Sequence, residues 1–166
     1  LHGDPSIRVA VGAGPDYVVD RNSLKFDPNP ISIQLDSFDV SFDIVNLGQR
    51  KDDKMLIEVL QELPNGEPFY LASDSIDAPG FKQTINYRFP TLGSRALGAN
   101  KFFIEIDKGN NIVELPNPIA EENNKLINSG GTEGIIVHFI SNEVIPVFPK
   151  EFSIVDNSNL TLKAST

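Results

Sequence analysis

The sequence predicts an all-β fold, an immunoglobulin-like antiparallel sandwich of about seven strands in Greek-key order. The first observation is that apolar residues recur with a period of two, because successive side chains of a strand point to opposite faces. The second is that 12 glycines and 12 prolines punctuate the 166 residues at intervals typical of turns in a sandwich. The third is that the pattern lacks the crossover helices that a parallel sheet requires.

Three segments show the alternation most clearly. Residues 38–44, 81–89 and 101–107 place apolar side chains at nearly every second position, with polar side chains between them. Each segment therefore predicts a strand with one face in the core and one face in water. Residues 31–35 also alternate, but the parity breaks at Asp36, which predicts a turn or a bulge before the next strand.

Two further segments need a second argument. Residues 54–63 fit either a strand or an amphipathic helix. We predict a strand, because Pro64-Asn65-Gly66 follows with hairpin chemistry and residues 69–71 can form the return strand. Residues 134–140 are densely apolar, which predicts a strand buried on both faces.

The sandwich is expected to span residues 16–140. Residues 1–15 end in a glycine- and proline-containing break and are expected to be the end of a preceding domain or a linker. Residues 141–166 start a new apolar rhythm and are expected to form extra strands or the start of a following module. Because the chain begins with Leu1 and carries no signal-like segment, we expect it to be part of a larger protein whose targeting segments lie elsewhere.

Composition excludes several classes of partner and site. The chain has 23 acidic and 14 basic side chains, a formal charge of -9, which repels phosphate backbones, so we expect no nucleic-acid partner. It contains no cysteine, which excludes disulfides, thiol nucleophiles and cysteine-type zinc sites in this chain. No apolar run approaches the roughly 20 residues that a membrane helix needs, so no membrane insertion is expected.

Catalytic motifs are not found in the sequence. The two histidines are His2 and His138, and the second lies in an apolar strand where a packed or edge position is expected. There is no Gly-x-Ser-x-Gly element, and Gly12-x-Gly14 is followed by Pro15 rather than by a helix that could bind phosphate. We therefore expect that the chain is not an enzyme and that it has no catalytic residue and no cofactor-binding residue.

One stretch is rich in oxygen ligands. Asp107, Asn111 and Glu114 are candidate calcium ligands, because carboxylate and amide oxygens are the donors that calcium prefers. Two more acidic residues, Glu121 and Glu122, follow. The spacing is not that of an EF-hand. The other interpretation is a capped hairpin turn between two strands, whose small polar residues adopt positive φ, and the pattern favours this second interpretation.

A family resemblance rests on three motifs. They are Asp16-Tyr17-Val18-Val19, Val45-Asn46-Leu47-Gly48, and Ile112-Val113-Glu114 followed by Glu121-Glu122-Asn123-Asn124. Together they resemble the bacterial cell-adhesion-related CARDB family. The resemblance implies an immunoglobulin-like sandwich over residues 16–140. The long spacer between Asn124 and Gly134 departs from the family pattern.

A second resemblance lies at the start of the chain. Residues 1–9, Leu-His-Gly-Asp-Pro-Ser-Ile-Arg-Val, are similar to the closing segment of gingipain-like cysteine peptidase domains in large exported proteins of the Bacteroidetes. This resemblance implies that the chain lies beside a peptidase domain, whose catalytic cysteine and histidine would lie upstream.

These observations predict a non-catalytic structural or interaction module of the adhesion type. We expect it to belong to a larger secreted or cell-surface bacterial protein and to be accessory to a neighbouring domain. The expected partners are neighbouring domains of the same chain, a surface protein or a glycan. The alternative is a carbohydrate-binding module, against which the sequence offers no tryptophan and only Tyr17, Tyr70 and Tyr87.

Overall fold

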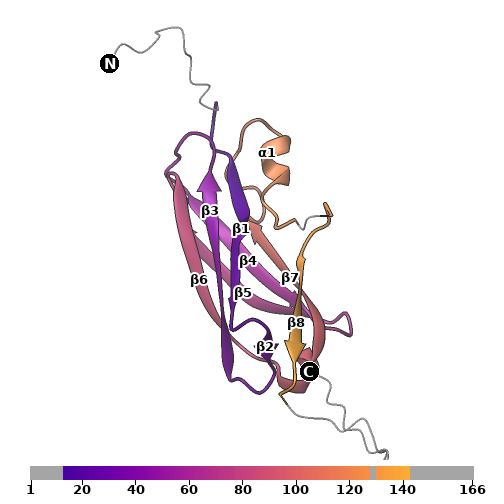
Figure 1. Ribbon diagram of the computed structural model, residues 1–166. Coiled ribbons are helices and arrows are strands. Elements are labelled where there is room, and N and C mark those ends of the chain that lie inside the picture. Colours follow the sequence, from indigo (N-terminus) through magenta and orange to yellow (C-terminus); the bar gives the residue numbers. More distant parts are fainter. Residues whose placement is uncertain (1–12, 128–129, 143–166) are drawn as a thin grey trace, which may run out of the picture.

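Residues 13–127 and 130–142 are described by the computed structural model, and they form two β-sheets packed face to face (Figure 1). The elements are, in chain order, β1 (Tyr17–Asp27), β2 (Ile31–Ser32), β3 (Ser37–Asn46), β4 (Lys54–Glu62), β5 (Pro68–Asp77), β6 (Lys82–Pro90), the 3-10 helix η1 (Gly93–Ala96), β7 (Gly98–Ile106), α1 (Ile119–Glu122) and β8 (Ile135–Ile140). The expectations for residues 1–12 and 143–166 lie outside this description.

The smaller sheet has the strand order β1-β3-β6 and the larger one β2-β8-β7-β4-β5. The connections β3–β4, β5–β6 and β6–β7 pass from one sheet to the other, whereas β4 and β5 form a hairpin within the larger sheet. The longer strands pair antiparallel, and only the two-residue β2 runs parallel to its neighbour β8. The predicted antiparallel sandwich is confirmed.

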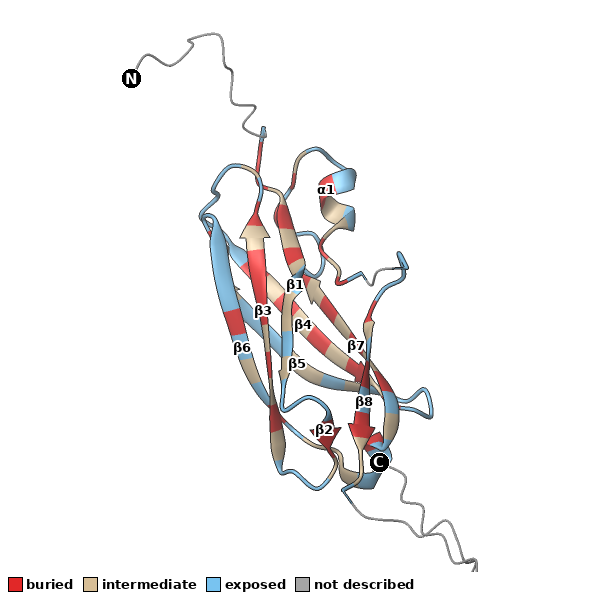
Figure 2. Cartoon of the chain, in the orientation of Figure 1, coloured by how far each residue is buried: buried red, intermediate tan, exposed pale blue. Residues whose placement is uncertain are grey.

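The core is made by the inward-facing positions of both sheets. Burial alternates along β3, β4 and β7, as the red bands of Figure 2 show. Three phenylalanines from different strands meet at the centre: the ring centroid of Phe38 lies 6.0 Å from that of Phe102 and 5.4 Å from that of Phe139. Burying each such ring contributes about 1.5–3 kcal/mol, so the period-two pattern is the main source of stability.

The ambiguous segment 54–63 is a strand, as the turn after it predicts. Gly66 has φ +83°, a conformation that glycine adopts without steric cost. The N–H of Leu63 donates to the carbonyl of Glu67 at 2.9 Å and so closes the hairpin. β4 is an inner strand of the larger sheet, because it pairs with β5 on one side and with β7 on the other.

Two expectations about burial are wrong. β8 is buried on one face only, since Ile136 is 62% exposed and His138 is exposed. The reason is that β8 has no second layer over its outer face, and β2 pairs with only its last two residues. Phe81, which shares the parity of the β6 core residues, is 73% exposed because it lies in the loop before that strand.

The turn at Asp107 does not connect two strands. The segment after β7 continues through irregular backbone to the short helix α1 and then returns alongside β7, where an isolated bridge pairs Glu105 with Lys125. Among the described residues, no helix is long and apolar enough to cross a membrane.

Candidate metal centre

Asp107 organises the turn at the end of β7. Its carboxylate accepts the backbone N–H of Asn111 at 3.2 Å and that of Ile112 at 2.9 Å. Its own φ is +47°, a left-handed conformation that aspartate tolerates better than most residues. The side chain is fully buried, so both hydrogen bonds lie away from solvent and fix the course of residues 107–112.

Glu114 joins three distant segments of the chain. One carboxylate oxygen accepts the backbone N–H of Tyr17, the first residue of β1 and 97 positions away. The other oxygen accepts the side-chain amide of Asn124 at 2.8 Å. Asn124 is held in place because its backbone carbonyl accepts the backbone N–H of Ile106 at 2.9 Å. Glu114 is fully buried and holds the first residue of β1, which also pairs with Asn46 of β3.

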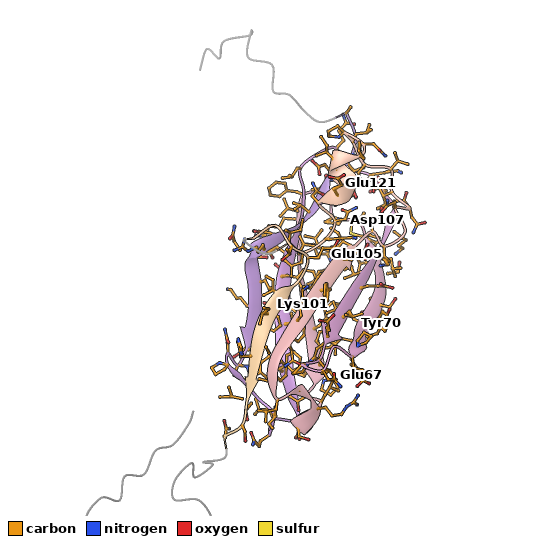
Figure 3. The ribbon with its side chains drawn as sticks, turned by 90° about the vertical axis from the view of Figure 1, so that its right-hand side faces the viewer. Glu67, Tyr70, Lys101, Glu105, Asp107 and Glu121 are labelled. Atoms are coloured by element: carbon orange, nitrogen blue, oxygen red, sulfur yellow. The ribbon has the colours of Figure 1, made fainter. Side chains whose placement is uncertain are left out.

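Glu121 comes from α1. Its Oε1 accepts the backbone N–H of Glu114 at 3.0 Å, whereas its Oε2 is buried and has no hydrogen-bond partner within residues 13–127 and 130–142. Asn123, two positions further on, donates to the Asp16 carboxylate at 2.9 Å and links the end of α1 to the residue before β1. Figure 3 labels Asp107 and Glu121 close together at the end of the sandwich where α1 lies.

Asp107, Glu114 and Glu121 form a group that we call the carboxylate cluster. One carboxylate oxygen from each lies within 4.8 Å of the others. None of the ion pairs found in residues 13–127 and 130–142 involves any of the three. The cluster therefore concentrates negative charge that basic side chains do not neutralise.

This environment changes the titration of the cluster. Burial, and then the charges of Glu121 and Asp107, raise the pKa of Glu114 to about 7, against the opposing hydrogen bonds from Tyr17 and Asn124. Burial also raises the pKa of Asp107, and Glu121 adds to that effect. Close carboxylates in a low-dielectric site cannot all ionise without compensation. The cluster can therefore hold a proton, or a hard cation with oxygen ligands.

A search of solved structures finds a similar protein. The CARDB domain of a Pyrococcus furiosus protein, crystallised in complex with di-metal ions, is 18% identical to this chain with a TM-score of 0.53, and the match covers 84% of this chain and 100% of that domain. The two share a fold. The family resemblance in the sequence thus agrees with the structural comparison about the architecture.

Two other solved structures are less similar. A Pseudomonas fluorescens alkylpurine DNA glycosylase, bound to DNA containing an abasic site analogue, is 12% identical with a TM-score of 0.46, over 76% of this chain and 31% of that one. A β-glucosidase from Paenibacillus barengoltzii is 13% identical with a TM-score of 0.38, over 80% of this chain and 16% of that one. No family model and no curated protein matches the sequence.

The structure brings together two of the three candidate calcium ligands. Asp107 and Glu114 belong to the carboxylate cluster, whereas Asn111 is exposed and its side-chain amide points toward the carbonyl of Lys108, 3.5 Å away. Glu121 completes the cluster in its place. The roles of Asn124 and of the Tyr17 N–H were missed by sequence reasoning, because no local spacing connects them to Glu114.

The Asn-x-Gly motif of the sequence also lies at this end. The Asn46 side chain is buried and accepts the N–H groups of Asp16 at 3.2 Å and Gly48 at 2.9 Å. Its amide donates to the carbonyl of Gln49 at 3.1 Å. A Cβ at Gly48 would lie 2.0 Å from the carbonyl oxygen of Gly14. The motif therefore serves to pack the turn after β3 against the chain that enters β1.

Proposed function

We propose that the chain is a non-catalytic structural and interaction module of a larger exported bacterial protein, accessory to a neighbouring domain. The observation that carries the proposal is that buried polar side chains, at the end of the sandwich where β1 begins, form hydrogen bonds within the fold. Asn46, Asp107 and Glu114 are all engaged with backbone groups of neighbouring segments. Asn46 and Glu114 therefore hold the chain that enters β1, and Asp107 holds the turn after β7. The fold shared with a CARDB domain supports the same role.

The exported location and the neighbour are part of the proposal. The similarity of residues 1–9 to the closing segment of gingipain-like peptidases supports a cysteine peptidase domain immediately upstream. The coding sequence before Leu1 provides the check: a domain with a cysteine and a histidine in catalytic spacing is expected. An upstream region made only of repeated sandwich domains would instead point to an adhesive stalk and overturn the peptidase association.

The module role is tested in the parent protein. We would replace residues 16–140 by a flexible Gly-Ser linker and measure the activity and the surface retention of the neighbouring domain. The expected result is that the neighbour stays folded and keeps its activity per molecule, while retention or partner binding is lost. Loss of the chemistry itself in a folded neighbour would show that the chain supplies catalytic groups and would contradict the proposal.

As a second part of the proposal, the carboxylate cluster holds one divalent cation, with calcium as the best match to its oxygen ligands. Asp107, Glu114 and Glu121 would hold it, and the unpartnered Glu121 Oε2 is the atom that fits this reading best. The metal would neutralise the cluster and hold α1 against the start of β1. Support also comes from the di-metal ions in the similar CARDB domain.

A thermal melt in calcium and in chelator tests the cation. Binding to the folded state alone stabilises by about 2.7 kcal/mol at a hundredfold excess over the dissociation constant, so the midpoint should rise clearly in millimolar calcium. Glu121→Gln should abolish the rise, whereas Glu122→Gln, at an exposed neighbour on the same helix, should keep it. An unchanged wild-type midpoint, or an equal rise in the Glu121→Gln variant, would sink the idea.

A further inference from the structure

The outer face of the larger sheet carries a row of apolar side chains across three strands. Leu60 on β4 pairs with Tyr70 on β5 and with Phe103 on β7. Directly paired residues project to the same side of a sheet, so the three side chains lie next to one another, with Tyr70 and Phe103 about 10 Å apart at two strand spacings. This row faces away from the core.

Tyr70 differs from the other two tyrosines. It is 66% exposed, whereas Tyr17 is fully buried and Tyr87 is half-buried and stacked on Phe89. Figure 3 labels Tyr70 on this side of the molecule together with Lys101 and Glu105. An aromatic ring kept in solvent beside further apolar side chains is a feature of binding surfaces.

The apolar row forms the floor of a groove of about 260 Å³. On one side of the row, Glu62 pairs with Lys101 in the sheet register, and the Lys101 ammonium lies 4.7 Å from the ring centroid of Phe103. On the other side, Glu58 pairs with Glu105. The groove thus has hydrogen-bonding groups along both flanks of an apolar strip.

Acidic groups outnumber basic ones around the groove, with Glu58, Glu62, Glu105 and Glu133 against Lys108 and Lys125. Lys108 forms ion pairs with Glu105 and, at 3.5 Å, with Glu58. Lys125 pairs with Glu133 at 3.1 Å. The strip therefore offers both acceptors and donors to a ligand, with an excess of carboxylates. An anionic ligand is not favoured by such a surface.

The two inner strands under the groove, β4 and β7, are already paired on both sides. β4 is hydrogen-bonded to β5 on one side and to β7 on the other, and β7 is also paired with β8. An extended peptide, which gains affinity by adding to a free sheet edge, would pair with the outermost strand β5 and would lie beside the strip rather than over Leu60 and Phe103. A ligand here must bind through side chains, with an apolar surface on the strip and hydroxyl groups at the flanks.

We propose that this outer face binds a neutral glycan chain. A pyranose ring has an apolar C–H face that packs on the Tyr70 ring and hydroxyl groups that donate to Glu58 and Glu62 and accept from Lys101. Leu60 and the half-buried Phe103 line the groove beside that ring. This site goes beyond the proposed module role. The module role is tested by experiments on the parent protein, and its outcome does not depend on glycan binding.

The experiment is a glycan array probed with the labelled 166-residue chain, followed by calorimetry with the best neutral oligosaccharide. Tyr70→Ala should weaken binding by roughly tenfold or more, because it removes the main stacking surface. Phe81→Ala is the matched control, since it removes an aromatic side chain that is 73% exposed but lies in the loop before β6, and its affinity should equal that of the wild type. Both variants are to be checked for a wild-type melting midpoint.

Three results would overturn the assignment. One is no binding to any neutral glycan on an array that spans plant, fungal, bacterial and animal polysaccharides. Another is equal affinity of the Tyr70→Ala and wild-type proteins. The third is affinity that falls steeply with salt, since a neutral ligand is insensitive to ionic strength and an anionic one is not.

Discussion

The chain uses carboxylates in opposite ways in two regions. In the outer groove, Glu105 and Glu133 each face a lysine ammonium and stay in contact with solvent. In the carboxylate cluster, Asp107 and Glu114 are buried and face backbone N–H groups. Exposed ion pairs contribute little to stability, whereas removing one partner of a buried polar group leaves the other unsatisfied. Carboxylates thus form solvated ion pairs in the groove, whereas in the cluster they are buried hydrogen-bond acceptors that stabilise the fold.

The largest expected loss of stability is for a substitution in the carboxylate cluster, and a matched substitution in the groove provides the comparison. Glu114→Ala leaves the Tyr17 N–H and the Asn124 amide without their acceptor in a buried site, and should lower the free energy of unfolding by about 3 kcal/mol. Glu105→Ala, in the outer groove, should change it by less than about 1 kcal/mol. Urea denaturation of both variants measures the contrast, and equal losses would show that burial does not distinguish the two regions.

The next effect sharpens the role of the end where β1 begins. Gly48→Ala places a methyl group against the carbonyl oxygen of Gly14, which already accepts the N–H of Gln49 at 2.8 Å. The backbone must shift, and we expect a loss of about 2–3 kcal/mol. Gly66→Ala is a poor control because of its positive φ, so Ser94→Ala, at an exposed site in η1, serves instead. Equal midpoints for both variants would contradict the tight contact.

The third effect is a pH dependence in chelator, where no added metal competes. The pKa of Glu114 rises from 4.5 to about 7, so between these values the folded protein keeps a proton that the unfolded chain has lost. The contribution of Glu114 to stability should therefore be fully present below about pH 4.5, decline by on the order of 2 kcal/mol toward pH 7, and then level off. The decline should vanish in Glu114→Gln. A wild-type stability that rises relative to this variant over the same range would refute the prediction.

The smallest effect concerns an exposed ion pair on the smaller sheet. Arg88 donates to Asp39 through two nitrogens at 2.7 and 2.8 Å, and this contact lowers the pKa of Asp39. Because the pair is solvated, Asp39→Asn should change the free energy of unfolding by about 0.5 kcal/mol at most. A urea titration at low and high salt measures it, and a large loss at high salt would be inconsistent with screening.

The sequence predicted those strands whose period is decided by one buried face. Phe38 and Phe42 lie on the core side of β3 as expected. The Pro64-Asn65-Gly66 turn correctly indicated a strand over residues 54–63. The prediction for β8 was wrong because a dense apolar run does not reveal how many layers cover a strand. Ile136 is apolar yet exposed on the outer face.

The candidate site was predictable only where its members are close in sequence. Asp107 and Glu114 are seven positions apart and stood out as an oxygen-rich stretch, and Glu121 follows at the same distance. Tyr17 contributes a backbone N–H, which carries no side-chain signal at all. Its approach to Glu114 depends on how β1 and the segment after β7 pack, and such tertiary contacts cannot be derived from local spacing.

The hydrogen bond between Glu114 and the start of β1 has a mechanical consequence. β1 begins at one end of the sandwich and β8 ends at the other (Figure 1), so tension applied across the described chain runs along the strands and shears β1 against β3. Before β1 can slide, the hydrogen bonds from the Tyr17 N–H to Glu114 and from the Asp16 N–H to Asn46 must break. The buried polar groups at this end thus increase the resistance of the domain to unfolding by a pulling force.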